Sequence, residues 1–538
     1  MQVVWFKRDL RWHDHAPLTQ AFQATPHHGP VLCLYVLEPS LWAQPDMAAQ
    51  HLGFIRESLA ELHSALRHLG GHLHVEVGEV VDVLARIHAQ APITVLRSHE
   101  ETGNAHTFAR DRTVARWCRA HGVPWHEHRQ FGVVRALNDR NQWQRAWEDH
   151  MALPQAPLPP PDAARFAAAS ITPEATWPTP QQLGLDPHQP PHRQRGGRTE
   201  GMAVLHDFLN HRCARYRGGI SSPLSAPDAC SRLSAHLAYG TLSLREVVQA
   251  TRARMAELAE QAHSAAPDAQ RQRAGLSAFV SRLYWHCHFI QKLESQPDIE
   301  WRNLHRGYDG LREPDWNPAH FAALTQGRTG WPLVDACVAM LHHTGWLNFR
   351  MRAMLVSVAS YPLWLHWQPV GLWLAREFLD YEPGIHWSQM QMQAGTTGIN
   401  TTRVYNPIKQ AQDHDPHGHF VRRWLPPLRR VPDAWLFEPW RMPPSVQRAC
   451  GVTVGVDIPE PLVDLATATR TAKARLHALR AQPEVKAAKA AIVQRHGSRK
   501  NMPGATARDA QGHETTPRRR TPNPPTTPSS TPQLSLDF

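Results

Sequence analysis

The chain opens with Val3-Val4-Trp5-Phe6-Lys7-Arg8-Asp9-Leu10-Arg11-Trp12-His13-Asp14, an apolar run that changes abruptly into charged residues. The apolar run is rich in β-branched and aromatic side chains, which favours a buried strand. Doubly wound parallel sheets bind ligands at the carboxyl ends of their strands, which is where the charged residues stand. This stretch therefore predicts the first strand of an α/β sheet with a ligand site at its edge.

Strand signals recur along the first quarter of the chain, at residues 2–6, 31–36, 72–77 and 93–96. A helical pattern lies between the second and third of them. Its apolar residues recur every three or four positions: Leu52, Ile55, Leu59, Leu62, Leu66 and Leu69. Gly70 and Gly71 then provide a stop signal. The alternation of strands and helices predicts a doubly wound parallel sheet over residues 1–135.

The composition changes after this region. Residues 136–200, and above all residues 153–195, are rich in Pro, Gln and His, which predicts an interdomain linker. Helical patterns then cover residues 202–215, 278–293, 332–341 and 347–367. Ser243 and Glu246 form a capping box at the start of a further helix. We therefore expect residues 201–485 to form an all-α domain.

The overall composition excludes several classes of protein. With 538 residues, 42% of them hydrophobic and 20% charged, the chain suits globular domains rather than a fibrous or wholly disordered protein. Its longest apolar stretch, residues 353–365, is shorter than a membrane span, and charges from Lys7 onward argue against a signal peptide. Seven cysteines without a CxxC spacing predict reduced thiols and hence a cytoplasmic protein.

The charge balance predicts a polyanionic partner. Lys and Arg number 58 against 47 Asp and Glu, which gives a formal net charge of +11. The chain also contains 20 Trp residues, whose rings suit packing, stacking or electron relay. DNA would use both the positive charge and the stacking surface.

Long motifs follow in the second half: Tyr216 with Ser231-Arg232-Leu233-Ser234 and Tyr239-Gly240-Thr241-Leu242-Ser243, then residues 327–336 (GRTGWPLVDA), 344–352 (TGWLNFRMR), 406–410 (NPIKQ) and 420–426 (FVRRWLP). Together with the opening stretch, these motifs closely resemble the photolyase/cryptochrome family. The resemblance extends over residues 2–459. It implies an α/β domain followed by a helical domain that binds FAD.

The resemblance implies a flavin-phosphate loop after Tyr216, made of Cys230, Ser231, Arg232, Leu233 and Ser234. Serine hydroxyls and free amides at the start of a helix suit an anion. Two ordinary helix caps are the alternative. Cys230 stands where relatives usually have Thr, so one phosphate contact is expected to be missing.

A second implied cofactor group surrounds the isoalloxazine ring. In relatives an arginine, here Arg352, pairs with an acid, here Asp380, beside the ring. A cation and a carboxylate there would tune the potential of the flavin. A buried structural ion pair is the alternative, and both can hold together. The other implied cofactor residues are Glu382, Pro383, Gly384 and His386.

The side implied to face DNA departs from the repair pattern. Relatives that repair lesions carry Glu and then Trp-Arg on one helix, where this chain has Arg282, Trp285 and His286. Arg350 matches an arginine near the DNA, whereas Phe349 replaces an Asn. We predict catalytic roles for Trp285, Arg350 and Arg282, with solvated surface charge as the alternative for the cations. The predicted DNA contacts are Arg282, Trp285, His286, Phe349, Arg350 and Gln410.

The electron relay of the family also changes. Relatives commonly reduce flavin through three tryptophans; Trp367 takes the middle position here, but Met390 takes the flavin-proximal position. Methionine is a poor hopping site, so either another route exists or photoreduction is weak. The candidates for another route are Trp387, Trp364 and Trp373, with Trp316 as an outer member. Simple packing of these rings is an equally open alternative.

Two further ligand questions arise from the sequence. Residues 99–104 follow a predicted strand end, so they are either part of a site for a second, antenna chromophore of unknown identity or an ordinary polar loop. Neighbouring histidines occur at residues 286–288, 342–343 and 413–419, but a chain with 36 His is expected to contain such neighbours. None of these groups has the spacing of a tetrahedral site, so we expect no metal.

Residues 486–538 are predicted to form a disordered tail, because they are rich in Pro, Thr and Ser and poor in large apolar residues. The apolar anchors at its end have no local core to join, which suggests a docking peptide. The last six residues resemble the hexapeptide by which bacterial polymerases and repair proteins bind the replication sliding clamp. The implied clamp contacts are Gln533, Leu534, Leu536 and Phe538.

The sequence thus predicts blue-light-dependent repair of UV-damaged DNA, in which reduced FAD passes an electron to a pyrimidine dimer. This mechanism follows from the resemblance. A cryptochrome-like photoreceptor without repair activity is the alternative, and a light-independent DNA-binding flavoprotein is a third reading. No membrane partner is expected.

Overall fold

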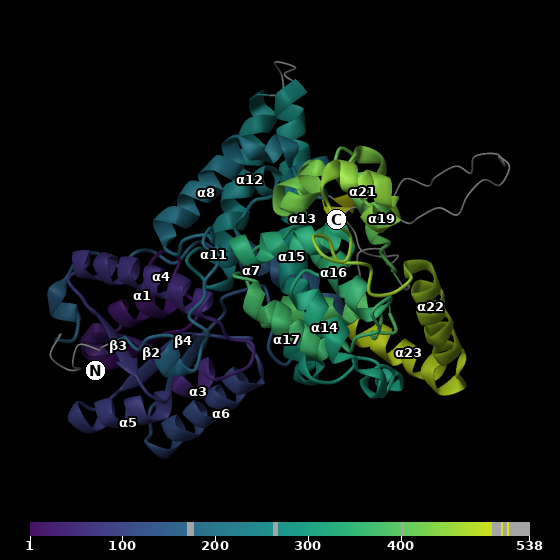
Figure 1. Cartoon of the computed structure of the whole chain (residues 1–538). Coiled ribbons are helices and arrows are strands. Elements are labelled where there is room, and N and C mark those ends of the chain that lie inside the picture. Colours follow the sequence, from purple (N-terminus) through teal and green to yellow (C-terminus); the bar gives the residue numbers. More distant parts are fainter. Residues whose placement is uncertain (169–176, 262–266, 400–402, 498–506, 509–513, 516–538) are drawn as a thin grey trace.

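A computed structural model describes the chain except for residues 169–176, 262–266, 400–402, 498–506, 509–513 and 516–538. Figure 1 shows an α/β part beside a larger helical part. The predicted order, a parallel sheet domain followed by an all-α domain, is confirmed. The predicted clamp contacts at 533–538 lie outside the described residues.

The sheet has five parallel strands in the order β3-β2-β1-β4-β5. Their bounds are β1 (Gln2–Phe6), β2 (Val31–Leu37), β3 (Leu73–Val77), β4 (Val95–His99) and β5 (Trp125–His128). The first four were predicted. The fifth was missed because it is an edge strand without β-branched residues, so its sequence gives a weak signal.

Helices cover both faces of the sheet. The α/β helices are α1 (Ala16–Gln23), α2 (Thr25–His28), α3 (Pro39–Trp42), α4 (Ala49–His68), α5 (Val80–Gln90) and α6 (Ala105–Ala120). Val4 and Phe6 pack with α1 and α4, whereas Val3 and Trp5 pack with α5 and α6. Alternate residues of β1 are therefore buried on opposite faces. The predicted stop of α4 is confirmed, because Gly70 has a φ of +91°.

The region from 136 to 200 is not only a linker. It contains α7 (Trp143–Ala152), which buries Trp143, Trp147 and Met151 in the core of the helical part. The expected linker is therefore wrong over these ten residues. The proline-rich sequence begins only after α7. The prediction of a linker extended too far toward the N-terminus and so included this helix.

The helical part contains α8 (Arg198–Asn210), α9 (Tyr216–Gly219), α10 (Ala226–Ala229), α11 (Ser234–Ala238), α12 (Leu244–Gln261), α13 (Pro267–Ser295), α14 (Pro318–Thr325), α15 (Pro332–Thr344), α16 (Phe349–Ser360), α17 (Trp367–Glu377), α18 (Pro383–Ala394), α19 (Pro407–His414), α20 (His419–Trp424), α21 (Pro444–Cys450), α22 (Leu465–Ala481) and α23 (Pro483–His496). The predicted capping box is confirmed: Ser243 N and Glu246 N each lie 3.1 Å from a side-chain oxygen of the other residue.

One expected helix is two. The pattern at residues 347–367 predicted a single helix, but α16 ends at Ser360 and α17 begins at Trp367. Pro362 has no amide hydrogen to donate, so it ends the helix. Between them, Trp364 has a φ of +55°. This break sets the separate positions of α16 and α17 around the site described below.

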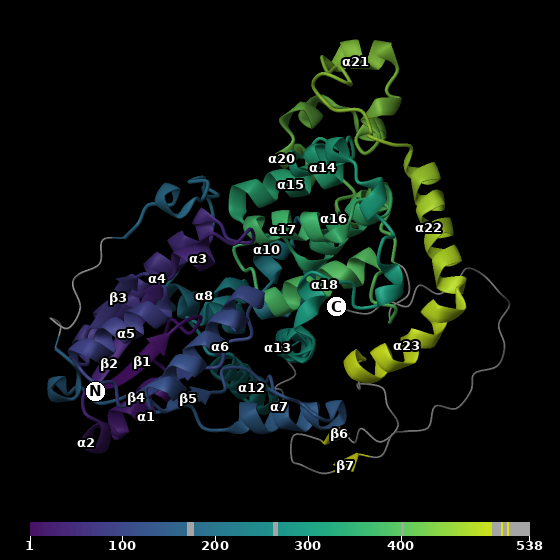
Figure 2. The ribbon, with the colours of Figure 1, turned by 90° about the horizontal axis from the view of Figure 1, so that it is seen from below.

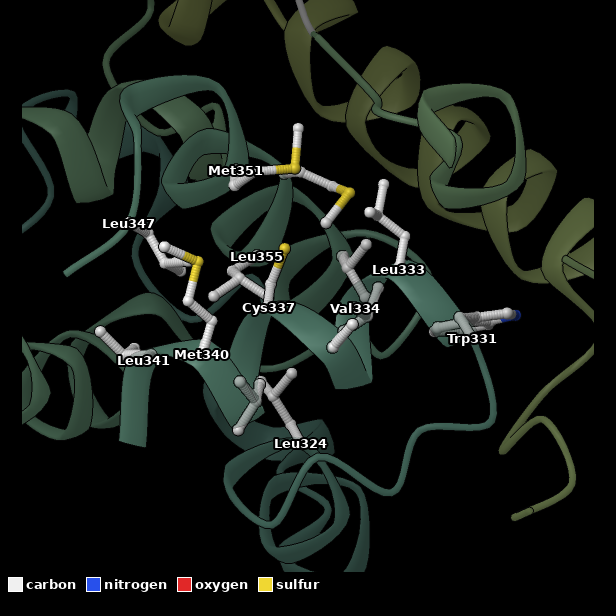
Figure 3. Close-up of a cluster of buried hydrophobic side chains, with 14 of the residues drawn as sticks. Leu324, Trp331, Leu333, Val334, Cys337, Met340, Leu341, Leu347, Met351 and Leu355 are labelled. Carbon is white, nitrogen blue, oxygen red and sulfur yellow. The ribbon is translucent and has the colours of Figure 1, made fainter. Parts of the chain in front are cut away.

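The core of the helical part lies between α15 and α16. Figure 3 shows Cys337 of α15 beside Leu355 of α16, and Met340 of α15 beside Leu347, which precedes α16. All four are buried. This packing fixes α16, whose polar residues carry part of the candidate site.

The C-terminal tail begins later than expected. Residues 486–496 belong to α23, because the run Ala487-Ala488-Lys489-Ala490-Ala491 has a high helix propensity. Val485 and the α22 residues Ala472 and Leu476 pack with Tyr308 and Tyr361. Figures 1 and 2 show α22 and α23 on the side of the helical part that faces away from the sheet. Farther along, β6 (Ala507–Arg508) pairs with β7 (Glu514–Thr515) in an antiparallel manner.

Among the described residues, no helix is both long enough and apolar enough to cross a membrane. The seven cysteines are all described and all unpaired.

Candidate flavin and DNA site

A bidentate ion pair joins α16 to the segment before α18. The two terminal nitrogens of Arg352 donate to the two Asp380 oxygens, each at 2.9 Å, and Arg352 Nε donates to the Leu347 carbonyl at 2.7 Å. Burial alone would raise the pKa of Asp380, but Arg352 outweighs it and lowers the pKa. The carboxylate is therefore charged at neutral pH. The expected pairing of Arg352 with Asp380 is confirmed, and its role toward flavin stays a prediction.

The loop at residues 230–234 is held from one side by its carbonyl groups. Arg212 donates to the carbonyls of Cys230 and Ser231, and Gln194 donates to the Arg232 carbonyl at 2.9 Å. Among the described residues, no oxygen accepts from the backbone amides of Ser231 and Arg232. Successive free amides of this kind form a site for an anion. The sequence did not reveal Arg212, whose role depends on contacts between separate segments.

Side chains around this loop connect it to the Arg352–Asp380 pair. The Ser234 hydroxyl and Arg232 both act on Asp380 and lower its pKa. Arg232 has a φ of +63°, and its guanidinium lies 3.8 Å from the centre of the Trp346 ring. Burial raises the pKa of the Cys230 thiol to about 12, so the thiol stays neutral beside an anion. The loop and the ion pair therefore form one site.

Tyr216 forms the wall between this loop and α13. Its ring packs edge-on against Phe208 and Phe279, at centroid distances of 5.5 and 5.7 Å. Burial raises the pKa of Tyr216, with a smaller opposing effect from Arg282. Arg282 thus lies on the same side of α13 as the cofactor loop.

The first turn of α18 brings three further predicted cofactor residues together. Glu382 caps the helix by accepting from Gly384 N at 3.3 Å, and Pro383 occupies the first turn. A Cβ on Gly384 would lie 2.6 Å from Ile290 Cα, so glycine permits the close approach of α18 to α13. Burial raises the pKa of Glu382 to about 7, although Arg8 of the α/β part lies 3.7 Å away.

His386 is buried one turn farther along α18. Its Nε2 lies 2.9 Å from the Gly371 carbonyl of α17. A carbonyl can only accept, so Nε2 carries the proton. Burial lowers the pKa of His386 to about 4, which keeps the ring neutral at pH 7.

The predicted DNA contacts are spread over three helices. On α13, the Trp285 ring lies 4.8 Å from His288 and 5.7 Å from Phe289. On α16, Phe349 is 38% exposed, and the Nε of Arg350 is buried without a hydrogen-bond partner among the described residues.

The third of these helices, α19, packs against α15, and its last residue lies within reach of the charge of Arg350 on α16. Burial lowers the pKa of His414, and the nearby charges of Arg350 and Lys409 lower it further, so α16 and α19 contribute to one basic region. Gln410 is buried, and its Oε1 has no partner in the described part of the chain.

His286 does not join that basic region. Its ring packs against Phe131 at 5.2 Å, and burial together with the charge of Arg8 lowers its pKa to about 4. It therefore faces the α/β part of the molecule. This position does not favour direct contact with DNA, and the role predicted for His286 remains untested.

Of the tryptophans predicted to relay electrons, two are in contact with each other and the others lie apart from them. Trp367 and Trp387 are in edge-to-face contact, with ring centroids 5.9 Å apart and an interplanar angle of 71°. Trp316 instead packs against Phe321 at 5.1 Å. Trp364 lies between the guanidinium groups of Arg312 and Arg475, at 4.8 and 4.9 Å.

A second cavity lies at the carboxyl ends of β1, β2 and β4. Glu101 and Asn104 line it, and both belong to residues 99–104, the predicted antenna site or polar loop. Lys7 and Arg110 enter the same cavity and pair with Asp111 and Glu101, at 3.3 and 2.7 Å. Tyr239 and Tyr381 close it on the side of the helical part.

A buried group at the same edge has the spacing of metal ligands. Asp9 Oδ2 lies 2.9 Å from His15 Nε2 and 2.7 Å from His99 Nδ1. Leu18 N donates to His15 Nδ1, so the proton of a neutral His15 is on Nε2 and points at Asp9. A cation would have to displace that proton, so the geometry indicates a hydrogen-bonded triad rather than a ligand set.

The residues around the main site fit a flavin dinucleotide. The free amides of Ser231 and Arg232 suit its phosphates. The buried Oδ1 of Asn348 also lacks a partner among the described residues, so the site offers a polar group for a ligand. When bound, FAD supplies the absorption of light and the transferable electron.

Comparison with known proteins agrees with this arrangement. Residues 2–138 match the family model described as DNA photolyase, and residues 279–478 match the FAD binding domain of DNA photolyase. A deoxyribodipyrimidine photo-lyase from Streptomyces griseus is 31% identical over 486 residues, which cover 87% of this chain and 97% of the relative.

Two solved structures share the fold. A cryptochrome from Synechocystis sp. PCC6803 has a TM-score of 0.75 and 23% identity, and the match covers 88% of this chain and 98% of that one. An archaeal photolyase from Sulfolobus tokodaii, solved with two FAD molecules, has a TM-score of 0.70 and 23% identity, with coverage of 89% and 100%. The sheet domain, the flavin-binding helices and the Streptomyces relative together establish that the chain belongs to the photolyase/cryptochrome family and that its cofactor is FAD.

Proposed function

We propose that this protein repairs UV-damaged DNA under blue light, by transfer of an electron from reduced FAD to a pyrimidine dimer. The observation that carries the proposal is the continuity of the site. The Arg352–Asp380 pair adjoins the anion loop at 230–234, while Arg350, on the same helix, lies in a basic region. Cofactor binding and DNA binding are thus supported by two residues of one turn of α16.

Each residue of the candidate site has a separate task in this mechanism. The loop amides hold the cofactor phosphates, and Arg352 with Asp380 fixes the charge beside the ring. Arg350 contacts a DNA phosphate. A damaged base must leave the helical stack to reach a cofactor, a step for which photolyases are themselves a named example. Trp285 supplies the aromatic surface for such a base, and Arg282 approaches it from the next turn of α13.

A photoreceptor without repair activity is the alternative. Two observations favour it: Arg282 is a cation where repairing relatives have an acid, and Phe349 presents an apolar surface where they have an amide. A light-independent DNA-binding flavoprotein is the third reading. These readings differ in what happens to a lesion when the flavin is already reduced.

The primary experiment uses flavin-loaded protein reduced chemically under anaerobic conditions. Short single- and double-stranded DNA carrying a cyclobutane dimer or a (6-4) product is exposed to blue light, with a dark control. We expect light-dependent repair of one lesion. No repair of either lesion by protein that retains FAD contradicts the proposal and supports the photoreceptor.

A matched pair of variants sharpens this experiment. Trp285→Ala removes a stacking surface worth about 1–3 kcal/mol per base, so repair is expected to fall about fivefold or more. Trp301→Ala removes an indole that is 43% exposed, and repair should be unchanged. An equal loss in both variants would show that Trp285 has no specific role.

We also propose electron entry through Trp387 and Trp367, with Trp316 as a more distant member. Support comes from the edge-to-face contact of the first two rings. Pulsed blue light on flavin-loaded protein tests this route. Trp367→Phe should abolish most flavin reduction, and an unchanged yield would contradict it.

The cavity at the sheet edge is our proposed site for a second chromophore. It combines aromatic walls such as Trp5 and Tyr35 with the charges of Lys7 and Arg110. Purified protein should then release a second pigment on denaturation, in less than the amount of FAD if occupancy is partial. Its absence after expression in several hosts would argue against the site.

Residues 533–538 are proposed to deliver the protein to DNA by binding the replication sliding clamp in the cytoplasm. The support is the sequence of four anchors at the end of a Pro-rich segment. A labelled peptide of residues 530–538 should bind the clamp in fluorescence anisotropy, and a Leu536→Ala, Phe538→Ala peptide should not. If neither peptide binds and deletion changes nothing in cells, this proposal fails.

A further inference from the structure

The indole of Trp387 occupies the space beside Met390. The two residues lie one turn apart on α18, and both pack against Gly371 of α17. A Cβ on Gly371 would lie 2.6 Å from Trp387 Cζ3 and 3.4 Å from Met390 Cγ. Trp387 is 1% exposed and directly follows His386. An indole is thus present next to the methionine that takes the flavin-proximal position.

The indole nitrogens of Trp367 and Trp387 have different surroundings. Trp367 Nε1 donates to Asn303 Oδ1 at 2.8 Å. Trp387 Nε1 is buried near the Tyr381 hydroxyl but makes no hydrogen bond of good geometry among the described residues. Both rings are 1% exposed, so water does not supply the difference.

The acceptor of Trp367 is itself connected to a carboxylate. Asn303 Nδ2 donates to Asp309 Oδ1 at 2.9 Å. Asp309 also pairs with Arg306 at 2.8 Å, which offsets part of its negative charge. The chain from Trp367 through Asn303 therefore ends on a residue of negative charge at the surface.

A hydrogen-bond acceptor stabilises the charged form of the group that donates to it. Loss of one electron leaves a positive charge on an indole, and a buried charge without a partner is costly. Trp367 has such an acceptor at 2.8 Å, whereas Trp387 faces only the Tyr381 hydroxyl, without a hydrogen bond of good geometry among the described residues. The positive charge is consequently more stable on Trp367 than on Trp387.

We propose that Asn303 is a positioning residue that sets the direction of electron flow toward the flavin. Trp387 gives one electron to the light-excited flavin, Trp367 gives one electron to Trp387, and the Asn303 carbonyl holds the positive charge on Trp367. An external thiol then returns one electron to Trp367 and releases its proton to solvent, and two such thiols end as a disulfide. This inference rests on the proposed function, since it requires FAD beside His386.

Trp364 is off the path for a reason of position, because its ring has no aromatic contact with Trp367 or Trp387 among the described residues. Its ring lies between the cations of Arg312 and Arg475, at 4.8 and 4.9 Å. Its Nε1 donates to Asp315 Oδ2 at 3.1 Å, and Asp315 also pairs with Arg475, so the charges around this ring oppose one another. Trp373, on α17 with Trp367, has no aromatic contact with either relay ring in the described part of the chain, so it provides a matched control.

The test compares Asn303→Leu with Asp309→Asn and Trp373→Phe in flavin-loaded protein. Blue-light pulses with a thiol give the yield of flavin reduction, and time-resolved absorption gives the lifetime of the oxidised tryptophan. Asn303→Leu should lower both about tenfold or more, because a hydrogen bond to a charged group is lost. Asp309→Asn should lower them severalfold, and Trp373→Phe should leave them unchanged.

A second readout needs no flavin. In flavin-free protein, Asn303→Leu should move the indole N–H resonance of Trp367 and leave that of Trp387 in place. An unchanged lifetime in Asn303→Leu overturns the proposal. If that variant does not fold, an unchanged lifetime in Asp309→Asn, a change at an exposed residue, overturns it instead.

Chemical reduction separates this inference from the proposed function. Protein reduced before illumination does not need the relay, so Asn303→Leu should then repair as well as the wild type. Normal photoreduction without repair would contradict the proposed function alone. Normal repair without an effect of Asn303 on photoreduction would contradict this inference alone.

Discussion

Two arginines of α16 that are two residues apart have opposite surroundings. Arg352 is held by both oxygens of Asp380, at 2.9 Å each. Arg350 has no carboxylate within ion-pair distance among the described residues, although its Nε is buried. A buried cation that is already paired fits a fixed internal site, whereas an unpaired cation is available to an anionic partner. The proposed function therefore implies a cofactor side that is preorganised and a DNA side that is completed by its ligand.

The largest effect is expected from Arg352→Gln. This change leaves the Asp380 carboxylate buried without its partner, which costs about 3–5 kcal/mol. The variant should purify with little flavin and a lower unfolding temperature. Arg350→Gln, the matched change on the same helix, should retain its flavin and lose less than about 1 kcal/mol. Equal losses of flavin and of stability in the two variants would show that the two arginines do not differ in their roles.

A pH titration tests whether the Glu382 carboxyl, on the cofactor side, is uncharged in the folded protein. Burial raises the pKa of Glu382 to about 7 from an ordinary value of 4.5. The folded chain therefore keeps a proton that the unfolded chain releases near pH 4.5, so stability falls as the pH rises toward 7. Glu382→Gln has no carboxyl to titrate, so it does not lose this stability. As the pH rises, the difference in the free energy of unfolding between variant and wild type should therefore grow to about 3 kcal/mol. Thermal unfolding between pH 4.5 and 8 measures it; a difference independent of pH would mean that Arg8 keeps the carboxylate ionised.

The DNA side predicts a smaller, salt-dependent effect. Arg350→Gln should weaken binding to damaged and undamaged DNA alike, and reduce the slope of log affinity against log salt by about one. Fluorescence anisotropy at several salt concentrations gives both quantities. Arg116→Gln, at an exposed residue of α6 on the sheet domain, removes the same charge and should leave the slope unchanged. A slope that is unaffected by Arg350→Gln would mean that this arginine does not meet a phosphate.

Local sequence was sufficient to predict most of the regular helices and strands. It was insufficient to predict an edge strand and the points at which some helices end. The periodic leucines of α4 and the capping box of α12 act within one or two turns, so both could be predicted. The edge strand β5 and the division between α16 and α17 depend on neighbours that are distant in sequence. Helix α23 was missed because its alanines resemble a low-complexity tail as much as a helix.

The candidate site shows the same limit. Motif resemblance identified Arg352 and Asp380, which are 28 residues apart and confirmed as a pair. It could not identify Arg212, Asn303 or Gly371, since each acts through a tertiary contact with a carbonyl, an indole or a ring from another segment. The buried Asp9, His15 and His99 triad was missed for the same reason, because β4 supplies one member.

The smallest effect is expected at Cys230, the residue of the predicted phosphate loop that differs from the usual Thr of relatives. The neutral thiol of Cys230 is a weak donor, whereas the Thr that relatives carry there would offer a hydroxyl to a phosphate. Cys230→Thr should bind FAD tighter by about 0.5–1.5 kcal/mol, a few-fold to tenfold change in the dissociation constant. Cys230→Val has the shape of Thr without the hydroxyl and should show no gain. Isothermal titration of flavin-free protein distinguishes them: if Thr and Val behave alike, the amides of Ser231 and Arg232 already satisfy the phosphates, and the preorganisation of this side is complete without the hydroxyl.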